Sequence, residues 1–538
     1  MLVGVWQPTA IARGWSWPEL AVMCQTPSVT RLVLAGLLAL AACAASDQRS
    51  ALPPRDLDLA TQPHAVAPVP SGEDAGTAVV PPAPVPAPPV PTPVPAAPQA
   101  PNAATLERLA WPATTTSFVL HSSAHVYAAP DLTSEPLGKI IVATRLPVGE
   151  SVAGDKQCKV WLAAVPRGWL CARYAKPSTL PPGAIVQPEV PVGKLLPQDY
   201  YGIKTGAKRY ATEDDVRAGI ARPEPKARST YMVTKEKTVD IDGETYVATS
   251  VGLVAASDLY KHWPSTFAGV DLITSPPPAW PFAWVIAANR KTATARAAAD
   301  KKAAEAGTFA HREIVPVLEE VAGFVRVGDG KWLERTSVRI ARKQPRPAVN
   351  AAHTKWIDLD RDEQVMVAYE GDTPVFATLF SSGLRKTDTP PAVYRIRSKT
   401  AVTKMAAEER EASHYEVSEV PWATRFRSGL YFHAAYWHDQ FGTAKSHGCV
   451  NLAPRDARWV YDWTEPTMPV GWNELEVPVA ESMVVRIHDA KQPDPPEFDY
   501  EREAIERVKI RKREKELKRK REQAEAAAAA GTPAPVPP

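Results

Sequence analysis

Between residues 355 and 397, hydrophobic and polar side chains alternate along the chain. The segments with this pattern are 355–359, 364–369, 374–380 and 393–397. An alternation of period two is typical of β-strands with one buried face. Residues 115–175 also form short hydrophobic runs, which turn residues interrupt, so a second group of short strands is predicted there. The pattern therefore predicts a mostly β protein.

The N-terminal region carries a single apolar run instead. Residues 31–43 read RLVLAGLLALAAC. One arginine before a short apolar run with small residues predicts a secretory signal. The run is too short for a transmembrane helix of roughly 20 residues, which excludes a polytopic membrane protein.

The end of this run resembles the lipobox of bacterial lipoproteins, because residues 40–43 read LAAC. The resemblance implies that residues 1–43 are a signal peptide with a lipobox and that Cys43 carries a lipid. A plain cleaved signal is the alternative. Ala44 follows the cysteine, which by the same resemblance implies a periplasmic protein anchored in the outer membrane. A soluble periplasmic protein remains the second possibility.

Proline is strongly enriched after the signal. The chain has 55 prolines, and 16 of them fall within residues 53–101. Proline lacks an N–H group and interrupts helices and sheets, so we expect a Pro/Ala-rich disordered linker over residues 44–110. It serves either as an extended spacer or as an inert connection.

Residues 111–180 resemble a bacterial SH3-like barrel, in which a Gly-Trp-Leu strand, here residues 168–170, closes the module. Cys158 and Cys171 lie on neighbouring predicted strands, and in an oxidising periplasm they are expected to form a disulfide. Two buried thiols are the alternative. Residues 200–343 weakly repeat the pattern and predict one or two further small β modules. Within them, residues 292–307 are expected to form a short helix or an exposed insertion.

The strongest chemical signal is the segment around Cys449. His447 lies two positions before this cysteine and His433 lies sixteen before it, and Gly448 separates the nearer pair. An imidazole near a thiol can take its proton and so create a thiolate nucleophile. Backbone N–H groups beside Gly448 can stabilise an oxyanion. The segment therefore predicts a Cys–His acyl-transfer site.

The Cys–His cluster has three alternative interpretations. A lone cysteine is often a small buried hydrophobic residue. His433, His438, His447 and Cys449 could bind zinc, but their spacing matches no zinc signature. A papain-type peptidase has its cysteine before its histidine, whereas His433 precedes Cys449 here.

Residues 446–451, SHGCVN, resemble the signature of the bacterial L,D-transpeptidase family, and His433 matches the second element of that signature. Residues 382–383 and 389–390 resemble an earlier core motif of the family, with Pro391 where a glycine is usual. The resemblance covers about residues 350–488, and we place a catalytic domain at 348–490. It implies a β-sandwich-like fold with a short helix after the cysteine.

The resemblance implies a role for each residue of the site. Cys449 is the nucleophile, His433 the general base and His447 an orienting or charge-tuning residue. Ser446 is a hydrogen-bonding support, and Gly448 contributes to the oxyanion hole. The expected substrate-binding residues are Tyr436, Trp437 and Asn451.

The implied reaction is acyl transfer from peptidoglycan stem tetrapeptides, with D-alanine as leaving group and a thioester intermediate. An acceptor stem gives a 3→3 crosslink, a protein amine gives an anchored protein, and water makes the enzyme an L,D-carboxypeptidase. A non-catalytic wall-binding scaffold is a further alternative. No metal or organic cofactor is implied.

The C-terminal region is strongly charged. Residues 501–523 carry 11 basic and 6 acidic side chains, although the whole chain has a formal net charge of only +3. Glu–Lys and Glu–Arg pairs spaced by four predict a charged basic helix over 498–526, solvated or in contact with an anionic surface. Nucleic acid is not an expected partner of an exported protein. Residues 527–538 are expected to be a disordered tail.

Overall fold

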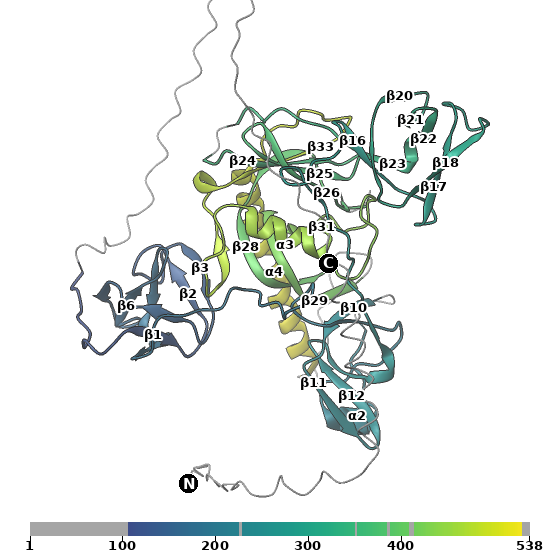
Figure 1. The fold of residues 1–538 in the computed structure, drawn as a ribbon. Helices are drawn as coiled ribbons and strands as arrows, with labels where there is room; N and C mark the ends of the chain where they lie inside the picture. The colour runs from purple at the N-terminus through teal and green to yellow at the C-terminus, as the bar shows by residue number, and fades with distance from the viewer. Residues whose placement is uncertain (1–105, 225–228, 350–351, 385–387, 408–413, 530–538) are drawn as a thin grey trace, which may run out of the picture. The chain divides into compact units, whose positions relative to one another are not determined.

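The computed structural model describes residues 106–224, 229–349, 352–384, 388–407 and 414–529 (Figure 1), all within the unit Val94–Pro538. The signal and lipobox expected over 1–43, including Cys43, lie outside the described residues, as do most of the expected linker 44–110 and residues 530–538. The mostly β prediction is confirmed. None of the described helices has both the length and the apolar character needed to cross a membrane.

The strands expected between residues 355 and 397 form one sheet around a buried core. This six-stranded sheet has the order β15-β26-β25-β24-β33-β27, with β24 and β33 parallel. Its strands are β15 (Val270–Asp271), β24 (Lys355–Asp360), β25 (Val365–Glu370), β26 (Thr373–Leu379), β27 (Ala392–Arg395) and β33 (Val484–His488). Alternate apolar side chains of the sheet, such as Ile357 and Met366, join the largest hydrophobic cluster.

A short helix, α3 (Pro454–Trp463), follows the cysteine-containing segment, as the resemblance implied. Proline is tolerated in its first turn, where an N–H group has no helical partner. The helix buries Ala457, Val460 and Tyr461, which are three and four residues apart and therefore share one face. This face packs against the strands that carry the candidate site.

A second sheet holds the candidate site and extends well beyond it. Its central strands are β28 (Ser398–Ala406), β29 (His414–Arg427) and β32 (Trp472–Glu476), and β30 (Leu430–Ala434) and β31 (Val450–Leu452) branch from β29. The complete sheet has 13 strands, because strands of two other modules join it at β29 and at β32.

The first module, residues 106–183, joins the sheet through β3, which is antiparallel to β32. Gly138 lies at this junction with φ of 150°, and a Cβ atom there would lie 2.1 Å from the Glu474 carbonyl oxygen, so the close approach requires glycine. The strands of this module are β1 (Ser117–Leu120), β2 (Ala124–Tyr127), β3 (Pro136–Ile140), β4 (Arg145–Pro147), β5 (Ser151–Ala153), β6 (Val160–Ala163), β7 (Trp169–Cys171) and β8 (Ala175–Ser178).

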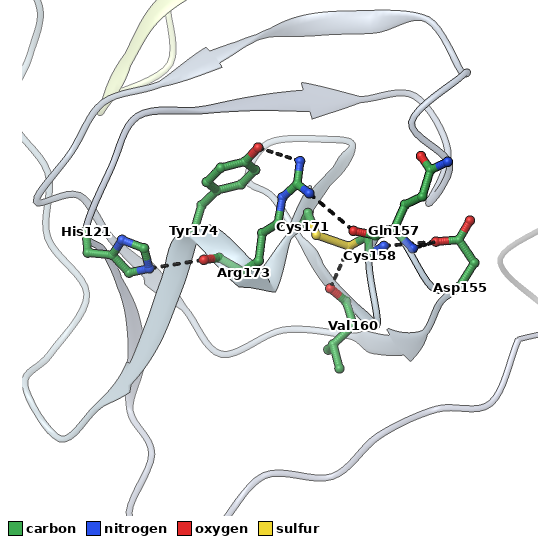
Figure 2. The surroundings of a disulfide bond; sticks show 8 residues. All are labelled: His121, Asp155, Gln157, Cys158, Val160, Cys171, Arg173 and Tyr174. Atoms are coloured by element: carbon green, nitrogen blue, oxygen red, sulfur yellow. Dashed lines mark hydrogen bonds between the residues drawn. A yellow bond between two sulfur atoms is a disulfide. The ribbon is translucent and has the colours of Figure 1, made fainter. Parts of the chain in front are cut away.

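A disulfide joins Cys158 and Cys171 within the first module (Figure 2), with an S–S distance of 2.08 Å. Asp155 supports the loop before Cys158, because its Oδ1 atom accepts hydrogen bonds from the N–H groups of Gln157 and Cys158. A bridge that closes a loop of this size stabilises a module by about 3 kcal/mol.

The second module, residues 200–261, joins the same sheet through β10, which runs parallel to β29. Its elements are β9 (Tyr200–Ile203), α2 (Glu213–Ala218), β10 (Ser229–Thr234), β11 (Lys237–Ile241), β12 (Glu244–Thr249), β13 (Gly252–Ala255) and β14 (Leu259–Lys261).

The third module comprises residues 282–341. Its strands are β16 (Phe282–Val285), β17 (Thr292–Arg296), β18 (Glu305–Ala310), β19 (Ile314–Pro316), β20 (Glu319–Val321), β21 (Phe324–Gly328), β22 (Lys331–Glu334) and β23 (Val338–Ala341). Of the two predictions for residues 292–307, the short helix is wrong, because β17 and β18 pair there as a hairpin.

The basic helix expected over 498–526 is α4 (Tyr500–Ala529). Its first residue is fixed to β29, where the Tyr500 hydroxyl donates a hydrogen bond of 2.6 Å to the Phe426 carbonyl. Its described side chains are otherwise mostly exposed, and Glu516 pairs with Lys520 at 3.3 Å as the spacing predicted.

Candidate active site

His433 and Cys449 are brought together by two neighbouring strands. His433 lies on β30 and pairs with Asn451 on the parallel strand β31. Cys449 comes two residues before Asn451, immediately ahead of β31. Because alternate residues of a strand share a face, the imidazole and the thiol lie on the same side of the sheet.

A tight turn presents the thiol. Gly448 has φ of 120°, which residues with a Cβ atom rarely adopt. The Ser446 hydroxyl closes the turn, since it donates a hydrogen bond to the Cys449 carbonyl (2.5 Å) and accepts one from the Gly448 N–H (3.0 Å). Ser446 thus holds the hydrogen-bonding position expected of it.

The Gly448 N–H group is therefore occupied within the turn. The resemblance implies that Gly448 and the Cys449 N–H together help to form an oxyanion hole. The Gly448 N–H instead donates to Ser446, and the positive φ makes Gly448 a conformational residue of this turn. The Cys449 N–H remains the candidate oxyanion donor.

Thr389 connects the turn to the earlier motif of the sequence. Its hydroxyl accepts a hydrogen bond from the Gly383 N–H (2.8 Å) and donates one to the Gly448 carbonyl (2.7 Å). Its side chain is fully buried. The Ser382 carbonyl accepts from the Ser446 N–H at 2.9 Å. The two motifs therefore form one support beneath Cys449, and Pro391 leaves it intact.

The Cys449 side chain is half-buried at the pocket, and its loss of hydration there raises the pKa of the thiol to about 11. The Tyr431 N–H group acts in the opposite direction, but less strongly. The thiol donates a hydrogen bond of 3.5 Å to the Gly429 carbonyl. The raised pKa favours a neutral thiol at rest, so that a base such as His433 has to take its proton before or during attack.

The His433 imidazole is also neutral, because burial lowers its pKa to about 4. Its Nδ1 atom lies 3.1 Å from the Ala434 carbonyl oxygen. A carbonyl can only accept, so Nδ1 carries the proton and the Nε2 lone pair is left to act as a base. Trp437 stacks on this ring, with a centroid separation of 5.7 Å.

Both groups open into one pocket of about 240 Å³. The expected site residues on its wall are His433, Trp437, Ser446, His447, Cys449 and Asn451. Sequence reasoning missed the remaining lining residues, which are Thr230, Met232, Met405, His414, Tyr415, Val417 and Lys445. Lys445 adjoins the signature and could have been found there, whereas the others come from strands whose pairing no local motif reveals.

Tyr436 does not line the pocket, which corrects its expected role in substrate binding. Its side chain is buried, its ring stacks on Tyr200 at 3.8 Å, and its hydroxyl donates to the Ser418 carbonyl at 2.9 Å. Tyr436 is a packing residue. An aromatic residue between two site motifs gives no indication of which way its ring points.

Asn451 and His447 flank the cysteine in the sequence, and both line the pocket. The Asn451 amide meets His438 Nε2 at 2.9 Å, so His438 positions this residue from behind the pocket. His447 is exposed, and its ring lies 4.5 Å from that of Tyr415. Within the described part of the chain, no group of three or more His, Cys, Asp or Glu residues is arranged to hold a metal ion.

Comparison with known proteins bears on the same region. Residues 354–471 match the family model described as the YkuD L,D-transpeptidase catalytic domain. The part of the chain that holds the candidate site therefore resembles an L,D-transpeptidase catalytic domain. The matched residues include His433, Cys449 and the supporting Thr389.

Two curated relatives carry L,D-transpeptidase names. YciB of Bacillus subtilis (strain 168), whose name places it provisionally among the L,D-transpeptidases, is 27% identical over 129 residues, which are 22% of this chain and 63% of YciB. L,D-transpeptidase 2 of Mycobacterium tuberculosis (strain CDC 1551 / Oshkosh) is 44% identical over 48 residues, 8% of this chain and 12% of that protein. The chain therefore spans less than two thirds of either relative.

Solved structures of L,D-transpeptidases also match. The crystal structure of a mutant of the Enterococcus faecium L,D-transpeptidase is 18% identical, with a TM-score of 0.21, over 28% of this chain and 55% of that one. The NMR structure of the catalytic domain from E. faecium is 20% identical, with a TM-score of 0.21, over 26% of this chain and all of that domain.

Proposed function

We propose that the protein is a peptidoglycan L,D-transpeptidase that acts through a thioester on Cys449. The observation that carries the proposal is the shared strand face of Cys449 and His433, which opens into a pocket lined mostly by residues of the matched segment 354–471. A thiol beside a basic imidazole nitrogen is the arrangement that nucleophilic acyl transfer needs.

The first half of the reaction transfers the acyl group to sulfur. His433 Nε2 takes the thiol proton as Sγ attacks the carbonyl carbon of the third stem residue. The Cys449 N–H stabilises the resulting oxyanion. The carbon–nitrogen bond then breaks, and the D-alanine amine leaves with the proton that His433 gives back, so that a thioester remains.

In the second half, an amine attacks the thioester carbonyl. His433 accepts the proton of that amine, the carbon–sulfur bond breaks, and the sulfur leaves as a thiol after reprotonation. Acceptor identity then decides the product. An amine of another stem gives a 3→3 crosslink, a lysine of a protein gives an anchored protein, and water gives trimming.

The charge of the pocket supports a donor that carries carboxylates, as peptidoglycan stems do. Lys445 is the one residue with a permanent charge among the described lining residues, and no Asp or Glu lines the pocket there. The pocket thus offers a cation to a substrate carboxylate close to the reacting thiol.

The same proposal includes export of the protein and its attachment to a membrane through a lipid on Cys43. It also includes binding of the first module, as an SH3-like barrel, to the cell wall. A periplasmic peptidoglycan enzyme needs export, and a Pro-rich segment after a lipid anchor would hold it away from the membrane. Labelling with palmitate tests the anchor: Cys43→Ala must abolish the label, and labelling of the variant contradicts it.

The test of the enzyme uses the chain from residue 44 onward, incubated with disaccharide-tetrapeptides beside Cys449→Ala. Release of D-alanine, an acyl adduct on Cys449 and a dimer of two stems are the expected results. Tripeptide without dimer identifies a carboxypeptidase. A folded protein that binds sacculi but forms neither adduct nor product identifies a wall-binding scaffold instead.

A further inference from the structure

The second module contributes a strand at the same edge of β29 as the strand that carries His433. The first half of β29 pairs with β10, so that Ser229 lies opposite His414 and Met232 lies opposite Val417. The second half of β29 pairs with β30, where Thr424 lies opposite Phe432. Since β28 occupies the other edge, β10 and β30 follow one another along a single side of β29.

The residues of β10 alternate between two environments. Tyr231 and Val233 are buried in a hydrophobic cluster with other residues of the second module. Thr230 and Met232 face the other way and line the pocket that contains Cys449. The strand therefore has one face in its own module and one face in the candidate active site.

The second module is fixed to the segment that follows His433. The Tyr200 ring stacks on Tyr436 at 3.8 Å, and the Tyr200 hydroxyl donates to the Glu419 carbonyl at 2.9 Å. Tyr436 comes three residues after His433. A displacement of the second module would thus disturb the position of the pocket wall.

Met232 is itself held in position. His262 follows β14, and its Nε2 atom lies 2.8 Å from the Met232 sulfur. The centroid of this imidazole lies 6.1 Å from that of the Tyr436 ring. Met405 and Val417 line the same pocket. Together with Met232 they give it an aliphatic wall, in which the two methionines are adaptable because their thioether side chains are flexible.

We propose that the second module is a working part of the active site, and that Met232 and Thr230 on β10 form a wall that selects the acyl donor. The wall contacts the aliphatic part of the donor next to the reacting carbonyl, while the catalytic domain supplies the chemistry. The identity of the donor rests on the proposed function. The position of the wall rests on the pocket lining alone.

The test compares Met232→Ala with Met468→Ala in the full mature chain. Met468 is also partly buried, but it does not line the pocket, so its truncation controls for loss of packing. Circular dichroism and a melting curve establish that each variant is folded. Met232→Leu, which keeps an aliphatic side chain, should differ from the original chain less than Met232→Ala does in both measurements.

The first measurement is the rate at which iodoacetamide alkylates Cys449, followed by mass spectrometry of the peptide that contains it. Met232→Ala removes part of the wall, so alkylation should become faster than in the original chain and in Met468→Ala. Equal rates in all three would overturn the proposed wall. This arm requires no turnover.

The second measurement is the kinetics with disaccharide-tetrapeptide. Loss of an apolar contact to the donor should raise KM about 10-fold in Met232→Ala, with kcat nearly unchanged. An unchanged KM, or the same change in Met468→Ala, would contradict donor selection. If the original chain turns over no tetrapeptide, the proposed function fails, and the alkylation rates alone decide the position of the wall.

Discussion

His433 lies directly opposite Asn451 on the paired strands β30 and β31, and Cys449 lies two residues before Asn451. The sheet register, rather than a direct hydrogen bond, sets the relation between base and nucleophile. Loss of hydration lowers the pKa of His433 to about 4 and raises the pKa of Cys449 to about 11, and both shifts favour the neutral form. Proton transfer is therefore expected to occur during attack on the substrate.

The pH dependence of acylation should reflect this neutral pair. Burial lowers the pKa of His433 to about 4, so Nε2 stays unprotonated well below the ordinary histidine pKa of about 6.5. The rate of Cys449 acylation should fall only as the pH drops towards 4. Stopped-flow or mass-spectrometric acylation rates between pH 3 and 10 measure this profile.

Alkylation of Cys449 tests the other half of the pair. Because burial raises its pKa to about 11, the alkylation rate should keep rising beyond pH 9 instead of levelling off near 8.5. A plateau by pH 7 would show that a thiolate exists at rest. Glutathione under the same conditions supplies the reference profile.

Thr389→Val should lower kcat while leaving KM nearly unchanged. Valine has a similar shape but loses both hydrogen bonds that tie Gly383 to Gly448. The turn beneath Cys449 then loosens, and misplacement of a reacting group can cost on the order of 100-fold in rate. Thr389→Ser keeps the hydroxyl and should restore most of the activity. A variant with normal kcat would show that Thr389 does not position the turn.

Lys445→Ala should weaken binding of the donor. A hydrogen bond to a charged group contributes about 1.5–3 kcal/mol, so KM should rise by at least about 10-fold. Lys176→Ala removes an exposed lysine of the first module and provides the control. A donor amidated at its carboxylates should bind the original chain as weakly as Lys445→Ala binds the normal donor. If Lys445→Ala raises KM equally for the normal and the amidated donor, Lys445 does not recognise a carboxylate.

Asp456→Asn should stabilise the fold at neutral and alkaline pH. Burial raises the pKa of Asp456 to about 7 in the folded chain, while its carboxyl accepts from the Gly269 N–H at 2.8 Å. Between about pH 4 and pH 7 the unfolded chain ionises this group, whereas the folded chain keeps it mostly protonated. Stability is therefore lost as the pH rises from 4 to 7, by about 4 kcal/mol at most.

The asparagine variant removes that dependence, since its amide does not titrate. Urea unfolding at pH 4.5 and pH 8 measures the difference, and the two proteins should diverge as the pH rises. Parallel curves for the variant and the original chain would mean that Asp456 has an ordinary pKa in the folded state.

Local patterns in the sequence were sufficient to predict the core strands of the part that holds the candidate site. The alternation over 355–397 predicted β24 to β27, and Pro454 marked the start of α3. Such features depend on neighbours in the chain, which is why they are readable without a structure. The signature around Cys449 likewise identified the pocket residues that are close in sequence.

Contacts between distant strands were not predictable in the same way. Pairing of β10 with β29 brings together residues about 185 positions apart, and no periodicity specifies that register. For this reason Met232 was missed and Tyr436 was misassigned, since Tyr200 covers the ring that we expected in the pocket. The alanine-rich segment 292–307 favours a helix by composition, but its pairing as β17 and β18 outweighs that preference.

The large sheet ends in two very short strands, β14 (Leu259–Lys261) on one side and β5 (Ser151–Ala153) on the other. Long unpaired edges act as templates for other chains, whereas edges of three residues offer few free backbone groups. By covering β29 and β32, the first two modules also protect the part that holds the candidate site against strand-by-strand self-assembly. That part, cut free of both modules, would regain two open edges, and with them a tendency to aggregate.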